Sequence, residues 1–372
     1  MQFASPRLSR NRIAAAVALA SIATGVAPVA SAQSEQLVLE EIVVTARKRE
    51  ENLMDLAQSV SALSEAQIQS SFARDIRDLE GMAPNLVIDR IGAGPGVAAL
   101  SIRGVTHQDV EKSFDPAVGV VLDGIFLGTN TGQELQVFDM ERIEILRGPQ
   151  GTLFGRNTIG GLINVTRTKP QMDWAGKIRG TYGDYDRMDL EAVLHFPLFS
   201  DKLGGKVSYV TRQQDEGFYD NVFRGTEEPE IDYEAYGINL LWLPTDRLSL
   251  EYSYDYQEDN SDTPATANFS QPNDALCFLG GACAQGPTTP ELGKKYKSNQ
   301  NFSNLQYMEL DAHTFEANWD LAERMRLTYL FGYRESEERT DQDFDSTSID
   351  FFSTIRLQDY EQTSHELRLS GT

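Results

Sequence analysis

The chain has 372 residues, with 33 basic and 56 acidic side chains and a formal net charge of −23 at pH 7. This balance argues against nucleic acid as a partner, because nucleic-acid-binding domains are usually basic. No run of about 18 apolar residues follows residue 32, which excludes a membrane-spanning helix there. Membrane strands of alternating polarity are compatible with the same composition.

The first 32 residues have the layout of an export signal. Arg7, Arg10 and Arg12 form a basic start, a short apolar run begins at Ile13, and Ala30-Ser31-Ala32 has the form that signal peptidase accepts. The sequence therefore predicts a signal peptide over 1–32, cleaved before Gln33. The alternative is an uncleaved N-terminal helix.

Residues 33–60 form a polar segment with one isolated run of β-prone residues. Ile42, Val43 and Val44 are stiff, β-branched residues without a strand-like partner nearby in the sequence. Such a strand suits addition to the exposed sheet edge of a partner protein. It is equally suited to be an edge strand of this chain's own sheet. The run comprises Glu41, Ile42, Val43, Val44, Thr45 and Ala46.

Residues 61–170 are expected to form a compact α+β domain. Ser64 and Gln67 have the spacing of a helix capping box. One apolar helical stripe is predicted at Ile68, Phe72, Ile76 and Leu79, with Gly81 as its end. Short strands punctuated by glycines follow. The motif residues of this region are Arg103, Gly104, Asp123, Gly124, Arg147, Gly148, Pro149, Gly155, Gly160, Gly161 and Asn164.

From Trp174 onward, apolar and polar residues alternate with period two over nine or ten residues at a time. One fully apolar face opposite a charged face is what a membrane wall around a wet lumen requires. Strands of a soluble sandwich are usually shorter. The predicted strands lie near 175–182, 187–196, 204–213, 233–243, 247–257, 309–320, 325–335 and 356–369.

The lengths of the connections give a second test of a membrane wall. The connections 197–203, 244–246 and 321–324 are short, and 214–232, 258–308 and 336–355 are long. Short periplasmic turns alternating with long outer loops are typical of outer-membrane barrels.

Cys277 and Cys283 lie in the longest predicted outer loop. In an exported chain they are expected to form a local disulfide. The four histidines have no metal-ligand spacing, and no nucleophile elbow or cofactor fingerprint occurs. We therefore expect no metal, no cofactor and no enzymatic activity.

Taken in order, these segments resemble the TonB-dependent receptors of the Gram-negative outer membrane. The resemblance implies an α+β plug domain followed by an antiparallel transmembrane β-barrel, here about eight of an expected 22 strands, so that the barrel is truncated. It implies a division into signal peptide (1–32), TonB-box segment (33–60), plug (61–170) and partial barrel (174–372). It rests on Glu41–Ala46 as the TonB box and on Ser101–Gly104, Val121–Gly124, Ile143–Gly155 and Gly160–Thr166 as plug signatures.

The resemblance also implies a function and its partners. A monomeric receptor in outer-membrane lipid would import a scarce nutrient, a metal chelate such as a ferric siderophore, with TonB pairing to the box. Carbohydrate, haem and cobalamin are alternative ligands, and a truncated chain that does not transport is a further alternative. A passive porin or an adhesin is least favoured, because both lack a box and a plug. Arg103 and Arg147 would pair with glutamates of the barrel wall, or form hydrogen bonds within the plug.

Overall fold

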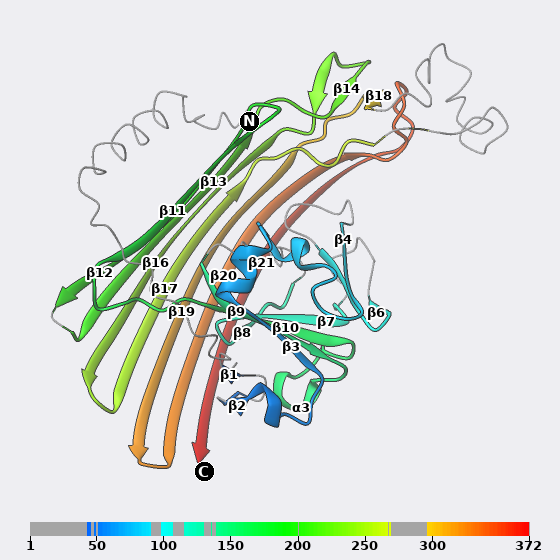
Figure 1. Cartoon of the computed structure of the whole chain (residues 1–372). Helices are drawn as coiled ribbons and strands as arrows, with labels where there is room; N and C mark the ends of the chain where they lie inside the picture. The colour runs from blue at the N-terminus through cyan, green and yellow to red at the C-terminus, as the bar shows by residue number, and fades with distance from the viewer. Residues whose placement is uncertain are drawn as a thin grey trace. The chain divides into compact units, whose positions relative to one another are not determined.

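The second half of the chain forms a large antiparallel sheet, as the alternation of its sequence predicts (Figure 1). The computed structural model describes residues 43–45, 48–49, 51–90, 98–106, 115–129, 135, 139–199, 201–266, 268 and 296–371. The sheet contains, in spatial order, β11 (Ala175–Gly183), β12 (Arg187–Phe199), β13 (Leu203–Gln214), β16 (Ile231–Thr245), β17 (Leu248–Asp259), β19 (Gln306–Ala322), β20 (Met325–Asp343) and β21 (Ser353–Gly371). All eight predicted strands are confirmed.

The outer ends of several strands extend beyond the prediction. β20 was expected to end near residue 335 and continues to Asp343, paired throughout with β21. The apolar alternation stops at Tyr333, but backbone pairing does not need it, because the ladder bonds are independent of side-chain polarity. The outer connections also contain a small three-stranded sheet that the sequence did not predict. It consists of β14 (Tyr219–Asn221), β15 (Thr226–Glu228) and β18 (Lys297–Ser298).

The two faces of the large sheet differ in the predicted way. On the face turned away from the plug, Ile178, Leu367 and Leu369 are 65%, 71% and 62% exposed. On the opposite face, Glu191 and Ser253 are buried. Apolar side chains exposed along one face of long strands fit contact with lipid.

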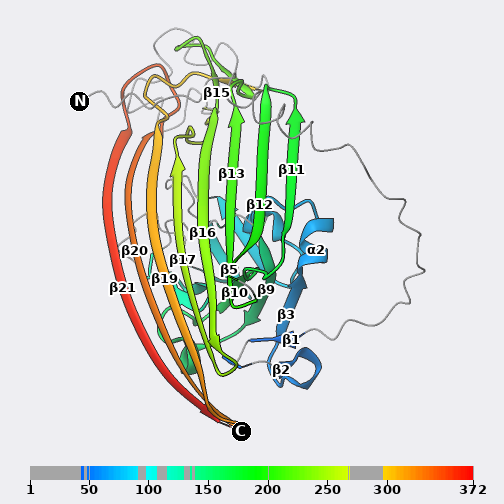
Figure 2. The same cartoon turned by 90° about the vertical axis from the view of Figure 1, so that its left-hand side faces the viewer.

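The plug domain is built around a mixed five-stranded sheet. Its order is β3-β9-β10-β7-β8, and β10 and β7 are parallel. The plug lies against the concave face of the large sheet, within one compact unit over Ile42–Thr372 (Figure 2). Its strands are β3 (Val60–Ser64), β4 (Leu86–Arg90), β5 (Ala98–Ile102), β6 (Val105–Thr106), β7 (Val118–Leu122), β8 (Ile125–Phe126), β9 (Met140–Arg147) and β10 (Gly161–Arg167).

The prediction of a single helix over the stripe from Ile68 to Leu79 is wrong, because the observed α-helix is shorter. The capping box of Ser64 and Gln67 is present, but α2 covers only Glu65–Ser70. Phe72 adopts φ 57° and is 84% exposed, so the chain turns there before the 3₁₀ helix η2 (Ile76–Leu79). The other described helices are η1 (Leu53–Asp55) and α3 (Gly151–Phe154). None of the helices in these ranges is long and apolar enough to cross a bilayer.

Two of the plug signatures form tight hairpin turns. Arg103 and Gly104 connect β5 to β6 with φ 56° and 75°, and Asp123 and Gly124 connect β7 to β8 with φ 48° and 85°. Two successive residues with positive φ are what a type I′ turn requires. The geometry of the turns therefore explains why these two dipeptides occur at these positions.

Gly119 lies on β7, between β10 and β8 of the plug sheet, and we expect Gly119→Ala to destabilise the plug. A methyl group there would lie 2.7 Å from Phe126 Cε2 and 2.9 Å from Leu162 Cδ1. Such overpacking should lower the free energy of unfolding by about 2 kcal/mol, measured by urea titration. Gly151→Ala is the control, because nothing lies within 4 Å of the added methyl group. Equal stability of the two variants would contradict this packing.

Candidate functional site: the box strand and its contacts

The described part of the box forms a short strand paired within the chain. β1 (Val43–Val44) pairs antiparallel with β2 (Glu51–Asn52), with Val43 opposite Asn52 and Val44 opposite Glu51. The expectation that this run has no strand-like partner nearby in the sequence is wrong, because β2 follows closely in the chain. The two strands form a separate two-stranded sheet and not an edge of the five-stranded plug sheet. Glu41, Ile42 and Ala46 lie outside the described residues.

Val44 anchors this strand to the plug through its side chain. It is fully buried in a cluster with Val121, Leu146 and Leu162. Complete burial of a valine side chain contributes about 2 kcal/mol relative to exposure. The box strand is therefore held by packing as well as by backbone pairing.

Thr45 is held by a buried carboxylate of the plug. The Thr45 backbone N–H donates to Glu144 Oε1 at 2.7 Å, and the Thr45 hydroxyl donates to the same oxygen at 3.1 Å. The Glu144 side chain is 0% exposed. It also accepts from Arg142 Nε at 3.0 Å and from Asn164 Nδ2 at 3.1 Å. The carboxylate thus has donors from the plug and from the box strand.

Lys48 connects the segment after the box to the large sheet. Its Nζ lies 2.7 Å from Glu366 Oε2 of β21 and 5.5 Å from the centroid of the Phe154 ring. β21 also contacts the plug, because Gln362 donates to the Phe126 carbonyl at 2.8 Å and accepts from the Gly128 N–H at 2.9 Å. One strand of the sheet therefore contacts both the plug and the box segment.

A charged triad joins the plug to β17. Arg167 Nε donates to Asp123 Oδ2 at 2.6 Å, and Arg167 Nη1 donates to Asp255 on the sheet. Burial alone would raise the pKa of Asp123, but the charge and hydrogen bonds of Arg167 hold it below its ordinary value. Burial would lower the pKa of Arg167, and the two carboxylates instead raise it. The charges of Arg167 and Asp123 therefore stabilise each other.

Further ion pairs line the contact between plug and sheet. Lys169 lies 3.1 Å from Glu251, and Lys206 lies 2.5 Å from Asp139. A polar cavity of about 650 Å³ opens beside these groups. Its lining includes Thr45, Lys48, Arg142, Arg167, Glu251 and Arg368. Charged side chains therefore make up much of this contact between the plug and the sheet.

The predicted wall partners of Arg103 and Arg147 are not seen in the described part of the chain, where no salt bridge joins either arginine to a carboxylate of the sheet. A Cβ on Gly148 would lie 3.2 Å from Arg103 Nη1, so the two signatures are close to each other. The Gly148 N–H donates to the Gly160 carbonyl at 2.9 Å, and Gly155 ends α3 with φ 80°.

The remaining residues of the plug signatures lie at the ends of strands. Pro149 lies after Gly148, just beyond the end of β9, and Gly161 begins β10 opposite Arg147. Sequence reasoning missed Lys48, Glu144 and Arg167. For Glu144 a signal existed, since it lies between Ile143 and Ile145 and must face the opposite side of the strand.

Cys277 and Cys283 lie outside the described residues, and no group of three or more metal-ligating side chains is found among the residues that are described.

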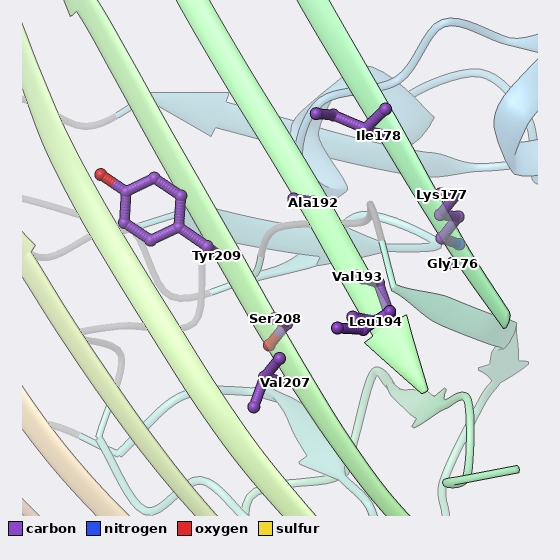
Figure 3. A pocket seen from close by; sticks show the side chains of 9 residues that line it. All are labelled: Gly176, Lys177, Ile178, Ala192, Val193, Leu194, Val207, Ser208 and Tyr209. Atoms are coloured by element: carbon purple, nitrogen blue, oxygen red, sulfur yellow. The ribbon is translucent and has the colours of Figure 1, made fainter. Parts of the chain in front are cut away.

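A second depression lies on the outer face of β11, β12 and β13 and has a volume of about 340 Å³ (Figure 3). Ile178, Leu194 and Val207 border it, and Ala192 lies between them. It is largely apolar and faces away from the plug, as expected of a surface that contacts lipid.

Comparison with known proteins gives consistent similarities. A family model described as the TonB-dependent Receptor Plug Domain matches residues 52–162. The pesticin receptor of Yersinia pestis is 32% identical over 207 residues, which are 54% of this chain and 29% of that receptor. The iron-regulated outer membrane virulence protein of Vibrio cholerae is 26% identical over 253 residues, 65% of this chain and 37% of that protein.

The fold is also similar to that of solved receptors. The crystal structure of the ferric yersiniabactin uptake receptor from Yersinia pestis matches with a TM-score of 0.69 and 20% sequence identity, over 85% of this chain and 46% of that chain. The chain thus spans less than half the length of each of these three proteins.

Proposed function

This chain belongs to the family of TonB-dependent receptors, and we propose that it acts in the outer membrane to import a small ligand with energy delivered through TonB. The observation that carries the proposal is the box strand. Val43–Thr45 is held by β2 and by the plug, toward the end of the sheet opposite β14 and β18 (Figure 1). A strand in this place can leave the plug toward the periplasm and pair with TonB by strand addition.

We propose a ferric siderophore as the ligand class. The similarity to a ferric yersiniabactin uptake receptor and to an iron-regulated outer membrane protein supports this choice. Carbohydrate, haem and cobalamin are the alternatives. A passive porin is disfavoured because the chain has a folded plug, which a porin does not need. Membrane lipid would contact the apolar outer face of the sheet.

The proposed division of the chain follows the sequence. We propose a signal peptide over 1–32 that is removed on export, a box segment over 33–60, a plug over 61–170 and barrel strands over 174–372. Arg103 and Arg147 remain proposed as plug residues that pair with the wall, and Cys277 and Cys283 as a disulfide. The receptor is proposed to act as a monomer and without catalysis.

The test is ligand uptake by cells that produce the chain and lack related receptors. Uptake of an iron-loaded siderophore should stop when a protonophore collapses the proton gradient of the inner membrane, while binding at the cell surface persists. A passive pore would continue to pass the ligand. Uptake that is insensitive to the protonophore would therefore contradict the proposal.

A further inference from the structure

We propose that Glu228 is a positioning residue that joins three outer connections of the sheet into one unit, the outer block, before any ligand binds. The first connection (215–230) lies between β13 and β16, the second (260–305) between β17 and β19, and the third (344–352) between β20 and β21. Of the second connection, 260–266, 268 and 296–305 are described. The inference rests on the proposed function, because the block would form part of the rim that captures the ligand.

The first observation is a buried carboxylate that collects donors from two of the connections. The Glu228 side chain is 2% exposed. Its Oε1 accepts from Arg224 Nη1 at 2.8 Å, from Thr226 Oγ1 at 2.9 Å and from Asn221 Nδ2 at 3.2 Å. Asn304 Nδ2, from the second connection, donates to Oε2 at 2.9 Å. A buried charge is tolerated only when it is paired and hydrogen-bonded, so Glu228 holds these donors in place around it.

The second observation is that backbone pairing also joins the first two connections. β14 of the first connection pairs parallel with β18 of the second, at one end of the large sheet (Figure 1). Asn221 Nδ2 donates to the Gln300 carbonyl at 3.0 Å. The Glu230 N–H donates to Asp262 Oδ2 at 2.9 Å, and the Asp262 N–H donates to the Glu230 carbonyl at 3.0 Å. The two connections are therefore bound to each other at several points.

The third observation is that side chains bind the third connection to the second. Asp343, at the end of β20, is buried, and its Oδ2 accepts the Asn301 N–H at 3.2 Å and the Phe302 N–H at 3.4 Å. Asn268 Nδ2 donates to the Asp345 carbonyl at 2.8 Å. A single polar network thus reaches all three connections.

A short segment of the second connection links Glu228 to the third. Asn304 donates to Glu228 and also to Gln300 Oε1 at 3.1 Å, and both Asn304 and Gln300 are 1% exposed. Asn301, whose N–H binds Asp343, follows Gln300 directly. Buried hydrogen-bond networks respond as units, so a change at Glu228 should loosen all three connections. A rim that is already ordered does not have to be ordered by the ligand.

Hydrogen exchange of the purified full chain without ligand, measured by mass spectrometry, tests the block. Peptides that cover 219–228, 297–305 and 343–347 should exchange slowly in the unmodified chain. Glu228→Gln removes the charge that accepts these hydrogen bonds and should speed exchange in all three peptides about tenfold. Glu227→Gln is the matched control, because it removes the same charge from the exposed neighbouring side chain and should leave all three peptides unchanged.

The exchange results decide between one block and separate loops. Faster exchange of Glu228→Gln confined to the 219–228 peptide would overturn the block, and so would unchanged exchange in the folded variant. If circular dichroism shows that Glu228→Gln does not fold, Thr226→Val decides, because it removes one donor to Glu228 and keeps the shape of the side chain. It should speed exchange in the same three peptides about threefold.

The rate of ligand association separates a positioning role from a purely structural one. The probe is the iron-loaded siderophore that cells producing the chain take up. It should associate more slowly with Glu228→Gln and dissociate at an unchanged rate, since only chains with an assembled rim can bind. Equal association rates in Glu228→Gln and Glu227→Gln would overturn the positioning role. Slower exchange of the three peptides in the unmodified chain after ligand is added would overturn assembly before binding.

The exchange experiment uses no ligand, so its outcome is independent of the proposed function. Uptake that is insensitive to the protonophore, together with slow exchange that Glu228→Gln speeds in all three peptides, would contradict the proposed function and support the block. Energised uptake with exchange that Glu228→Gln leaves unchanged would support the proposed function and overturn the block.

Discussion

Replacement of Val43 by proline is expected to abolish energised uptake and to leave ligand binding at the cell surface intact. Proline lacks the backbone N–H that a paired strand uses, so it is confined to strand edges and bulges. A partner carbonyl left without its donor costs about 2 kcal/mol, roughly thirtyfold in affinity for the added strand. Uptake of an iron-loaded siderophore by cells producing Val43→Pro measures the effect.

The control for this variant is Val43→Ile, which keeps the N–H and the β-branched side chain. It should take up ligand like the unmodified chain. Val43→Pro also weakens the pairing of Val43 with Asn52, so its box segment should exchange amide hydrogens faster. If Val43→Pro takes up as much ligand as Val43→Ile, the box strand has no role in the transport mechanism.

Replacement of Arg167 by methionine is expected to have the largest effect on stability. The side chains of Arg167, Asp123 and Asp255 are 16%, 21% and 24% exposed. Without the arginine, two largely buried carboxylates lose their counter-charge, which should lower the free energy of unfolding by about 3 kcal/mol. Urea titration of the purified chain, followed by circular dichroism, measures the change.

Two comparisons test whether charge is the cause. Arg74→Met removes an arginine whose side chain is 54% exposed in its pair with Asp78, and such pairs contribute less than about 1 kcal/mol. Combining Arg167→Met with Asp123→Asn should restore part of the lost stability, since it removes one of the two carboxylates that lost the arginine, while Asp255 keeps the nearby charge of buried Arg334. A double variant as unstable as Arg167→Met would contradict the electrostatic explanation.

The Asp123 carboxyl also makes this effect depend on pH. Its pKa in the folded chain is below its ordinary value, so its contribution to stability is present above about pH 4 and is lost as the pH falls through the folded pKa. In Arg167→Met, burial remains and the cation is gone, so the pKa of Asp123 should rise. The difference between the two proteins should therefore be largest at neutral pH and shrink toward pH 4.

The large sheet could be predicted from the sequence because its two faces meet different surroundings. Residues such as Leu250 and Tyr252 alternate with Glu251 and Ser253, and a period of two specifies both the strand and its buried face. The outer ends of β20 and β21 escaped prediction because their pairing continues where the apolar alternation has stopped.

The error over residues 64–79 has a different origin. Ile68, Phe72, Ile76 and Leu79 fit a helical stripe, and Ile68, Ile76 and Leu79 are indeed buried. Spacing alone cannot show that the chain turns at Phe72 and reaches the same core through two short helices. Tertiary packing determined this region more than helical periodicity did.

The side-chain contacts that hold Thr45 and Lys48 could not be read from the sequence, because they join distant residues. Thr45 and Glu144 are 99 positions apart, and Lys48 and Glu366 are 318 apart. The sequence indicated a strand that either pairs within the chain or pairs with a partner. The structure shows the first state and the groups that hold it, and TonB pairing remains our proposal.

The central claim is that the box strand leaves the plug and pairs with TonB when ligand binds. Disulfide trapping in intact cells tests it most directly, with Val43→Cys in this chain and single cysteines placed along the partner strand of TonB. We predict cross-links at adjacent register positions that increase when an iron-loaded siderophore is added. Absence of cross-links with and without ligand, in cells whose surface still binds the ligand, would contradict the account.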